Sequence, residues 1–187
     1  WGIRVPAATL RRFWGMLAHY HGQTWNASQI ASSLGTAHTT TQRYLDILTG
    51  AFMVRQLPPW HENLGKRLVK ASKLYIRDSG LFHSLMSLQT QESLYAHPKF
   101  GASWEGFALE QMLRRVPDRH AYFWGTHAGA ELDLLILRDG KRWGFEFKVS
   151  EAPSITKSMH ISLKDLKLQR LCVVYPGTLR FPMADRI

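Results

Sequence analysis

Two carboxylates and a lysine share a segment whose pattern is typical of a β-hairpin. In residues 129–150, apolar and polar side chains alternate on both sides of an Asp-Gly pair at 139–140, which favours a two-residue turn. Pairing the strands around that turn places Asp133 directly opposite Glu146 and puts Lys148 beside them. Like charges directly across a strand pair destabilise it. The pattern therefore predicts either a carboxyl group with a raised pKa or a bound cation.

The same register specifies the rest of the hairpin. It pairs Glu131 with Lys148, a favourable cross-strand contact. It also predicts one continuous apolar face, made of Leu132, Leu134, Ile136, Phe145, Phe147 and Val149. A slip of one residue would move every side chain to the other face, so we expect the register to be well determined.

The residue types at this position suit metal-assisted chemistry. Two carboxylates and a backbone carbonyl form a hard oxygen site of the kind that Mg²⁺ or Mn²⁺ prefers. A neighbouring lysine can orient a water molecule or meet phosphate charge, the layout of metal-assisted phosphodiester hydrolysis. The alternative is a solvated polar face on an edge hairpin, because structural networks also perturb carboxyl groups.

The order Leu132-Asp133, twelve intervening residues, then Glu146-Phe147-Lys148 resembles the PD-(D/E)XK motif of restriction-endonuclease-like nucleases, with leucine at the usual proline position. The resemblance implies that Asp133, Glu146 and the Phe147 carbonyl hold a metal ion and that Lys148 positions water. It also implies a further carboxylate from the preceding helix, at Glu105. Glu105 shares a helical stripe with apolar residues, and an acid on such a face needs a partner. A glutamate favoured by the helix dipole is the alternative for Glu105 alone.

The composition restricts the class of protein. The chain has 187 residues, of which 45% are hydrophobic, enough for one large or two small domains. A net charge of +10 points to a polyanionic partner, with nucleic acid first and a merely soluble basic surface as the alternative. The single Cys172 excludes a disulfide framework, and no signal or membrane-length apolar segment is present. We therefore expect a cytoplasmic location.

The first half of the chain predicts a helix-turn-helix. A helix capped by Asn26 stops at Gly35, and another helix begins near His38 or Thr39 and ends at Gly50. In helix-turn-helix proteins the polar start of the second helix enters the major groove. Here that part consists of Thr39, Thr40, Thr41, Gln42 and Arg43.

Strands at 52–57 and 74–76 then predict the wing of a winged helix. The segment around the wing supplies four basic candidates for phosphate contact: Lys66, Arg67, Lys70 and Lys73. A winged helix that packs against a neighbouring domain and never touches DNA is the alternative.

The expected architecture is α+β, in two domains. A winged-helix domain at 1–88 is followed by a polar, proline-bearing linker at 89–100. A restriction-endonuclease-like α/β domain with the hairpin at its centre occupies 101–187.

Residues 5–176 as a whole resemble the C-terminal region of uncharacterised prokaryotic AAA-type P-loop ATPases. The match is carried by HGQTWNASQIASSLG, TTTQRYLDIL, LPPWHENLGKRLVKASKLYIRDSGL, GASWEGFALEQ, GAELDLLI and FEFKVS, in that order. In such proteins an ATPase module precedes this region, so the resemblance implies an ATP-binding parent. DNA as a partner is expected from the net charge and the helix-turn-helix pattern, and the resemblance itself leaves the biological role open. No GxxxxGK[ST] motif occurs here, so we expect no nucleotide site in this fragment. The rival interpretation is a catalytically inactive module that docks on or regulates the ATPase.

Overall fold

The computed structural model describes residues 5–61 and 68–187. These residues form two compact units that interleave in the sequence. Unit 1 comprises the described residues up to Gln56 together with Ser72–Gly106, and unit 2 comprises the described part of 57–71 together with Phe107–Ile187. The sequence predicts a single boundary, within 89–100. The mixed α+β class is confirmed.

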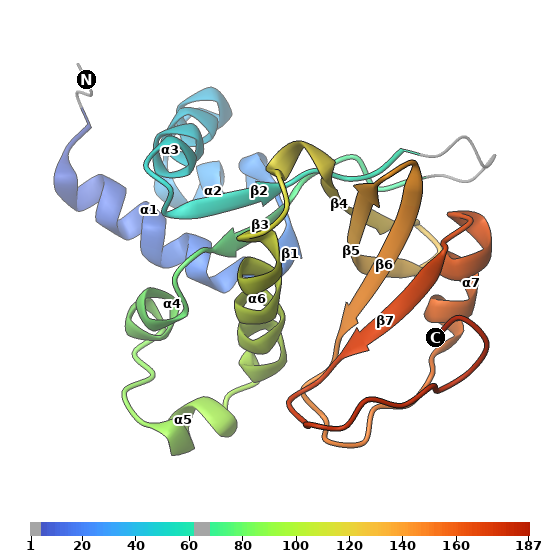
Figure 1. The fold of residues 1–187 in the computed structure, drawn as a ribbon. Helices are drawn as coiled ribbons and strands as arrows, with labels where there is room; N and C mark the ends of the chain where they lie inside the picture. Colours follow the sequence, from blue (N-terminus) through green and yellow to red (C-terminus); the bar gives the residue numbers. More distant parts are fainter. Residues whose placement is uncertain (1–4, 62–67) are drawn as a thin grey trace. The chain divides into compact units, whose positions relative to one another are not determined.

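Unit 1 contains most of the helices and a small sheet (Figure 1). Its strands lie in the order β1-β3-β2, and β1 pairs antiparallel with β3. In chain order the elements are α1 (Ala7–His19), β1 (Gln23–Thr24), α2 (Ala27–Leu34), α3 (His38–Gly50), β2 (Val54–Leu57), β3 (Lys73–Ile76), α4 (Ser79–Leu85), α5 (Gln91–Tyr95) and the first half of α6 (Phe100–Leu113). The short helix α5 lies in the stretch predicted as a linker.

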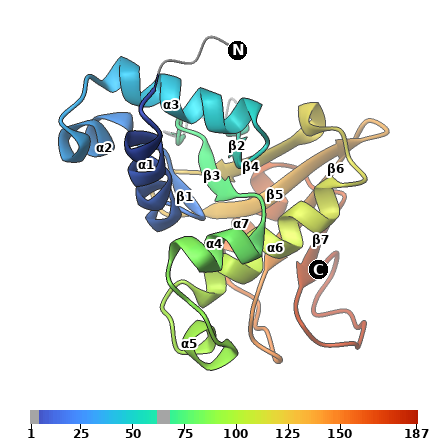
Figure 2. The ribbon, with the colours of Figure 1, turned by 90° about the vertical axis from the view of Figure 1, so that its left-hand side faces the viewer.

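The helix-turn-helix segment folds locally as its residues predict. The Asn26 side chain accepts a hydrogen bond of 3.2 Å from the Gln29 N–H, which caps the start of α2. Gly35 ends α2 with a φ of +65°, a conformation that glycine adopts without strain. The next helix, α3, begins at His38. Figure 2 shows α2 and α3 joined by this short turn.

A single apolar cluster holds these helices on the small sheet. Its largest fully buried members from helices are Phe13 and Leu17 of α1 and Phe82 of α4. The Phe13 ring meets the Tyr44 ring of α3 edge to face, with centroids 5.6 Å apart. The orientation of α3 within unit 1 therefore follows from core packing.

The predicted wing strands are present as β2 and β3, but the segment between them belongs to unit 2. The Trp60 N–H donates to the Phe123 carbonyl at 2.7 Å, and the Val69 N–H donates to the Gly125 carbonyl at 3.0 Å. The described residues of the segment thus run along strand β4 of unit 2, where β4 satisfies their backbone groups. Lys66 and Arg67 lie outside the described residues.

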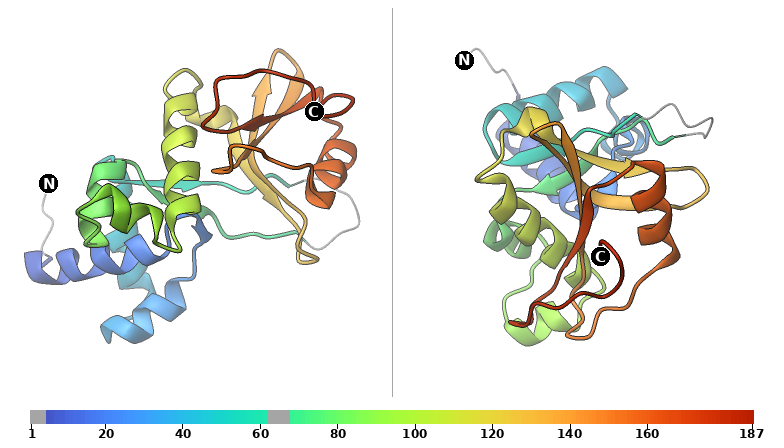
Figure 3. Two further views of the ribbon diagram at one scale, coloured as in Figure 1. Left: turned by 90° about the horizontal axis from the view of Figure 1, so that it is seen from below. Right: turned by 45° about the vertical axis from the view of Figure 1, so that its right-hand side comes forward.

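Unit 2 contains a four-stranded sheet in the order β4-β5-β6-β7. The first two strand pairs are antiparallel, and β6 pairs parallel with β7 after a crossover through α7. The elements are the second half of α6, a 3₁₀ turn (Asp118–His120), β4 (Ala121–Gly125), β5 (Glu131–Arg138), β6 (Lys141–Phe147), α7 (Lys157–Asp165) and β7 (Arg170–Val174). Figure 3 shows α7 beside one face of this sheet, and Met159 and Leu163 of α7 belong to the buried cluster there.

The hairpin turn and most of the hairpin register are confirmed. The ladder runs from Leu134 opposite Phe145 to Arg138 opposite Lys141. Both turn residues, at 139 and 140, have positive φ values, of 52° and 69°. That conformation matches the right-handed twist of the two strands.

The predicted continuous apolar face is wrong at one point, because β5 contains a β-bulge. On β4, Tyr122 pairs with Leu135 of β5, and Trp124 pairs with Leu132. The one β4 residue between Tyr122 and Trp124 therefore faces two β5 residues, at 133 and 134. The extra residue breaks the alternation. Leu132 and Leu135 consequently share the buried cluster under α7, although strict alternation would put them on opposite faces.

Among residues 5–61 and 68–187, no helix combines the length and apolar character that a membrane crossing requires.

Candidate functional site

Glu146 is the most unusual side chain of unit 2. It lies near the end of β6 and is only 3% exposed. Its Oε2 accepts a hydrogen bond of 3.1 Å from the Lys148 Nζ, whereas its Oε1 is buried without a hydrogen-bond partner among the described residues. A buried carboxyl oxygen without a partner is energetically costly. This oxygen can therefore accept a bond from a ligand that the protein itself does not supply.

The surroundings of Glu146 favour its neutral form. Burial raises its pKa, the charge of Asp133 raises it further, and the charge of Lys148 opposes both, with a result of about 8. Burial and the neighbouring Asp133 thus make the charged form of Glu146 costly, and the Lys148 ammonium group 3.1 Å away is the contact that offsets this cost.

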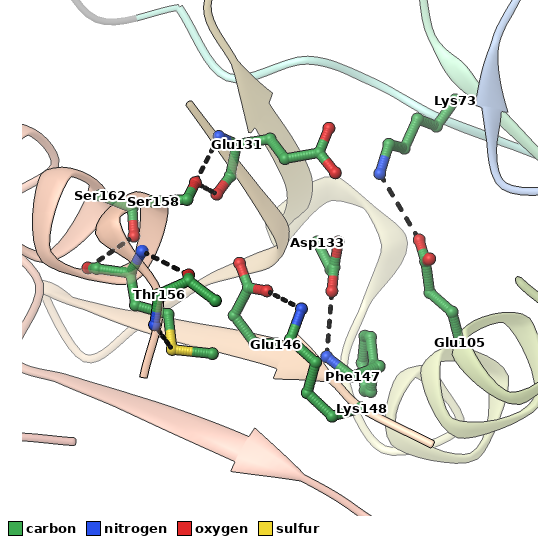
Figure 4. A network of polar contacts seen from close by, with 11 residues as sticks. Lys73, Glu105, Glu131, Asp133, Glu146, Phe147, Lys148, Thr156, Ser158 and Ser162 are labelled. Carbon is green, nitrogen blue, oxygen red and sulfur yellow. Dashed lines mark hydrogen bonds and ion pairs between the residues drawn. The ribbon is translucent and has the colours of Figure 1, made fainter. Parts of the chain in front are cut away.

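Asp133 lies in the bulged part of β5 and is also buried. Its Oδ2 accepts a hydrogen bond of 3.0 Å from the Phe147 N–H of β6. This contact across the hairpin fixes the side chain, and a bulge is a common means of redirecting a side chain from a strand. Figure 4 shows Asp133 and Glu146 on the adjacent strands with Lys148 beyond them.

Lys148 follows β6 and is anchored through its backbone, because its N–H donates to the Val174 carbonyl of β7 at 2.9 Å. About a third of its side chain is exposed (34%), so the ammonium group lies at the boundary between the buried acids and solvent. Asp133, Glu146 and Lys148 are thus brought together in one unit, as the motif predicts.

Glu131 is a further acid near this site, which the sequence assigns only to a pair with Lys148. Its charge adds to the rise in the pKa of Glu146. Its backbone is held by α7: the Ser158 Oγ donates to the Glu131 carbonyl at 2.6 Å and accepts from the Glu131 N–H at 2.7 Å (Figure 4). The sequence signal for this anchor is Thr156, whose side chain caps α7 and so places Ser158 in its first turn.

Glu105 belongs to unit 1, where it has partners. Its Oε1 accepts a hydrogen bond from the Tyr75 hydroxyl at 2.5 Å. The same oxygen accepts from the Lys73 Nζ at 3.5 Å (Figure 4). These contacts supply the partner that an acid on an apolar helix face requires. Lys73 is only 5% exposed, so its ammonium group is not presented to solvent as a phosphate contact. Of the other predicted wing lysines, Lys70 is exposed and lies in unit 2.

The predicted recognition residues of α3 divide into two groups. Thr39 and Arg43 are exposed and Thr40 is half-buried. Thr41 is buried, and its Oγ1 donates to the Ala37 carbonyl at 3.3 Å. Gln42 accepts from the Trp25 Nε1 at 2.8 Å and donates to Asp46 at 2.9 Å, so its amide serves the fold.

The donor set of the hairpin fits a hard divalent cation that keeps several of its waters. No group of three or more His, Cys, Asp or Glu residues is arranged to hold a metal within the described part of the chain. Mg²⁺, however, usually binds through one or two carboxylates and water. The buried Oε1 of Glu146 and the carboxylate of Asp133 meet that requirement.

Comparisons with known proteins return families without an assigned function. Residues 2–92 match a domain of unknown function (DUF8612), and residues 100–187 match another (DUF4143). Uncharacterised proteins of Mycobacterium bovis and Mycobacterium tuberculosis are each 50% identical to this chain over 186 residues. The match covers 100% of this chain and 42% of each relative, so the chain spans less than half of their length. No solved structure matches.

Proposed function

We propose that unit 2 is a divalent-metal-dependent phosphodiesterase domain, with Asp133, Glu146 and Lys148 as its working residues. The observation that carries this proposal is the Glu146 carboxyl group, which is buried, has one oxygen without a hydrogen-bond partner, and lies beside a second buried acid. A purely structural acid would be expected to have both oxygens satisfied. A bound cation would supply the missing partner and would favour the ionised form.

Each side chain has a separate part in this proposal. Asp133 and Glu146, with the Phe147 carbonyl, would hold Mg²⁺ or Mn²⁺, and the ion would supply Lewis acidity and lower the pKa of a bound water. Phe147 also keeps Asp133 in place through its N–H. Lys148, partly exposed next to Glu146, carries the positive charge that meets a phosphate oxygen or orients the attacking water. Glu105, the further carboxylate that the resemblance implies, belongs to unit 1 and has no part in this proposal for unit 2.

Binding of DNA by unit 1 is the second part of the proposal. It is favoured by the short turn between α2 and α3 and by the exposed Thr39 and Arg43 at the start of α3. The net charge of +10 supplies the attraction to phosphate that such binding needs. Thr40 is a secondary contact; the Gln42 amide is engaged by Trp25 and Asp46, and Lys70 belongs to unit 2, so neither is part of this proposal.

The wider context rests on the family resemblance. We place this chain in the C-terminal region of a longer cytoplasmic protein with an AAA-type ATPase module, which supplies ATP hydrolysis that this fragment does not perform. A catalytically inactive docking module for that ATPase remains the rival, and the experiments below separate the two.

The test of the nuclease activity is cleavage of plasmid and single-stranded DNA by the purified chain with Mn²⁺, Mg²⁺ or EDTA. We expect weak Mn²⁺-dependent cleavage. Asp133→Ala should lose both metal binding and cleavage, whereas Lys148→Ala should lose cleavage and keep metal binding, because lysine is not a ligand. Equal cleavage by the wild type and Asp133→Ala would mean contamination. Absence of both metal binding and cleavage would favour the docking module.

The test of DNA binding is its salt dependence. Affinity for duplex DNA should fall with a log-log slope of about −0.9 for each phosphate contact. Arg43→Ala should reduce that slope by about one unit, whereas Arg138→Ala, which removes an exposed arginine of the hairpin in unit 2, should leave it unchanged. No binding at about 50 mM salt, where the electrostatic contribution is large, would refute the proposal.

A further inference from the structure

Unit 2 has a cavity of about 500 Å³ along the edge strand β7, and none of the hairpin acids lines it. It is enclosed by β7 and by the C-terminal segment that follows. The segment is tied to the edge by the Leu171 N–H, which donates to the Arg186 carbonyl at 2.9 Å. Figure 3 shows this segment next to β7. The cavity is lined by three arginines and by no acidic residue.

Two of these arginines are not used by the fold. Arg170 and Arg180 have no hydrogen-bond or ion-pair partner among the described residues. Both lie near the half-buried Cys172 thiol, because both act to lower its pKa while burial raises it. Arg186 differs, since it pairs with Asp185 at 3.5 Å and donates to the Leu168 carbonyl. Two exposed arginines without a partner in the described part of the fold therefore line the same cavity.

The cavity also has an aromatic wall. The Tyr175 and Phe181 rings meet edge to face with centroids 6.2 Å apart, and the Tyr175 hydroxyl donates to the Leu179 carbonyl at 2.8 Å. The wall is not sealed, because Phe181 is 50% exposed and Leu179 is 74% exposed. Exposed aromatic rings are the surfaces on which nucleobases stack.

We propose that this cavity binds the phosphate and base of a nucleotide, with Arg170 and Arg180 on the phosphate and Phe181 against the base. A planar guanidinium group can donate two parallel hydrogen bonds to two phosphate oxygens, which gives geometric selectivity as well as charge attraction. The volume lies within the range of small-ligand pockets, roughly 300 to 1,000 Å³. The phosphate can come from a free nucleotide or from a single strand of nucleic acid, and the chemistry of recognition is the same. The site shares no residue with the hairpin acids, so each can be tested without the other.

The experiment is calorimetric titration of the purified chain with dTMP, thymidine, inorganic phosphate and single-stranded dT8, in EDTA at about 50 mM salt, where electrostatic binding is strong. We expect dTMP to bind more tightly than phosphate and thymidine not to bind. Arg170→Ala and Arg180→Ala should each weaken dTMP binding about tenfold or more, the loss typical of one charge-assisted hydrogen bond. Arg11→Ala, an exposed arginine of α1, is the charge-matched control and should leave dTMP binding unchanged.

A second measurement locates the ligand. Because Cys172 is the single cysteine and lines the cavity, bound dTMP should slow its reaction with a thiol reagent, and Arg170→Ala should abolish this protection. If dT8 slows the reaction of Cys172 more than dTMP does, the bound phosphate comes from a nucleic-acid strand. If the two ligands slow it equally, the phosphate comes from a free nucleotide. No binding of dTMP or dT8 by the wild type, or binding that both arginine variants retain, would overturn the proposal.

Discussion

Replacing Glu146 by glutamine should stabilise the metal-free protein, and the gain should depend on pH. Glutamine has the shape of the protonated acid but cannot ionise. In the folded wild type the pKa of Glu146 is raised from 4.5 to about 8. Below pH 4.5 both folded and unfolded chains hold the proton. Between those two values only the folded chain holds it, so the wild type loses stability as pH rises and levels off above pH 8.

The magnitude follows from the shift. A change from 4.5 to about 8, at 1.36 kcal/mol for each pKa unit, corresponds to about 5 kcal/mol of stability lost by the wild type across this range. This value is an upper bound, because small movements that admit water to Glu146 reduce the cost of its charge. Glu146→Gln should therefore match the wild type near pH 4.5 and exceed it by about 2 to 5 kcal/mol at pH 8.5.

The assay is urea denaturation in EDTA at pH 5, 6, 7, 8 and 9, with the difference in unfolding free energy between variant and wild type plotted against pH. Taking the difference removes the contribution of the titrating groups that do not interact with Glu146. Glu151→Gln, an exposed acid that loses the same charge, is the control and should give a flat line near zero. A difference for Glu146→Gln that does not change with pH, or a variant less stable than wild type at pH 8.5, would refute the reasoning about burial.

Three further predictions concern the same unit. The apparent affinity for Mn²⁺ should rise about tenfold for each pH unit up to about 8 and then level off, because Glu146 must lose its proton to bind metal. Calorimetry at three pH values measures this affinity, and an affinity that is independent of pH would contradict the prediction. Gly144→Ala should destabilise the protein by about 1 to 3 kcal/mol, since a Cβ there would lie 2.6 Å from a methyl carbon of Leu168; urea denaturation with an unchanged midpoint would contradict it. Arg170→Ala should raise the pKa of the Cys172 thiol further, because a neighbouring positive charge that favours the thiolate is lost; the pH dependence of its alkylation rate would detect this, and an unchanged profile would place Arg170 away from the thiol.

Much of the local structure of this protein can be predicted from its sequence. The start and end of α2 follow from Asn26 and Gly35, and the hairpin turn follows from the Asp-Gly pair at 139–140. In each case the determining interaction joins residues only a few positions apart, so a side-chain cap or a positive φ can be inferred without knowledge of the rest of the chain. The approach of Asp133 to Glu146 was predictable for the same reason, because a two-residue turn sets the register of the strands that it joins.

The tertiary structure alone decided the features that depend on residues far apart in the sequence. The bulge in β5 arises from its pairing with β4, and it moves Leu132 to the face that α7 covers. The predicted wing segment pairs with β4, because the edge of that strand has backbone groups that need partners. The sequence predicts Lys73 as a phosphate contact, yet it is buried beside Glu105, which lies 32 positions further along the chain. Charge and hydropathy predict which residues can form such contacts, but the choice among possible partners is made only when the elements pack together.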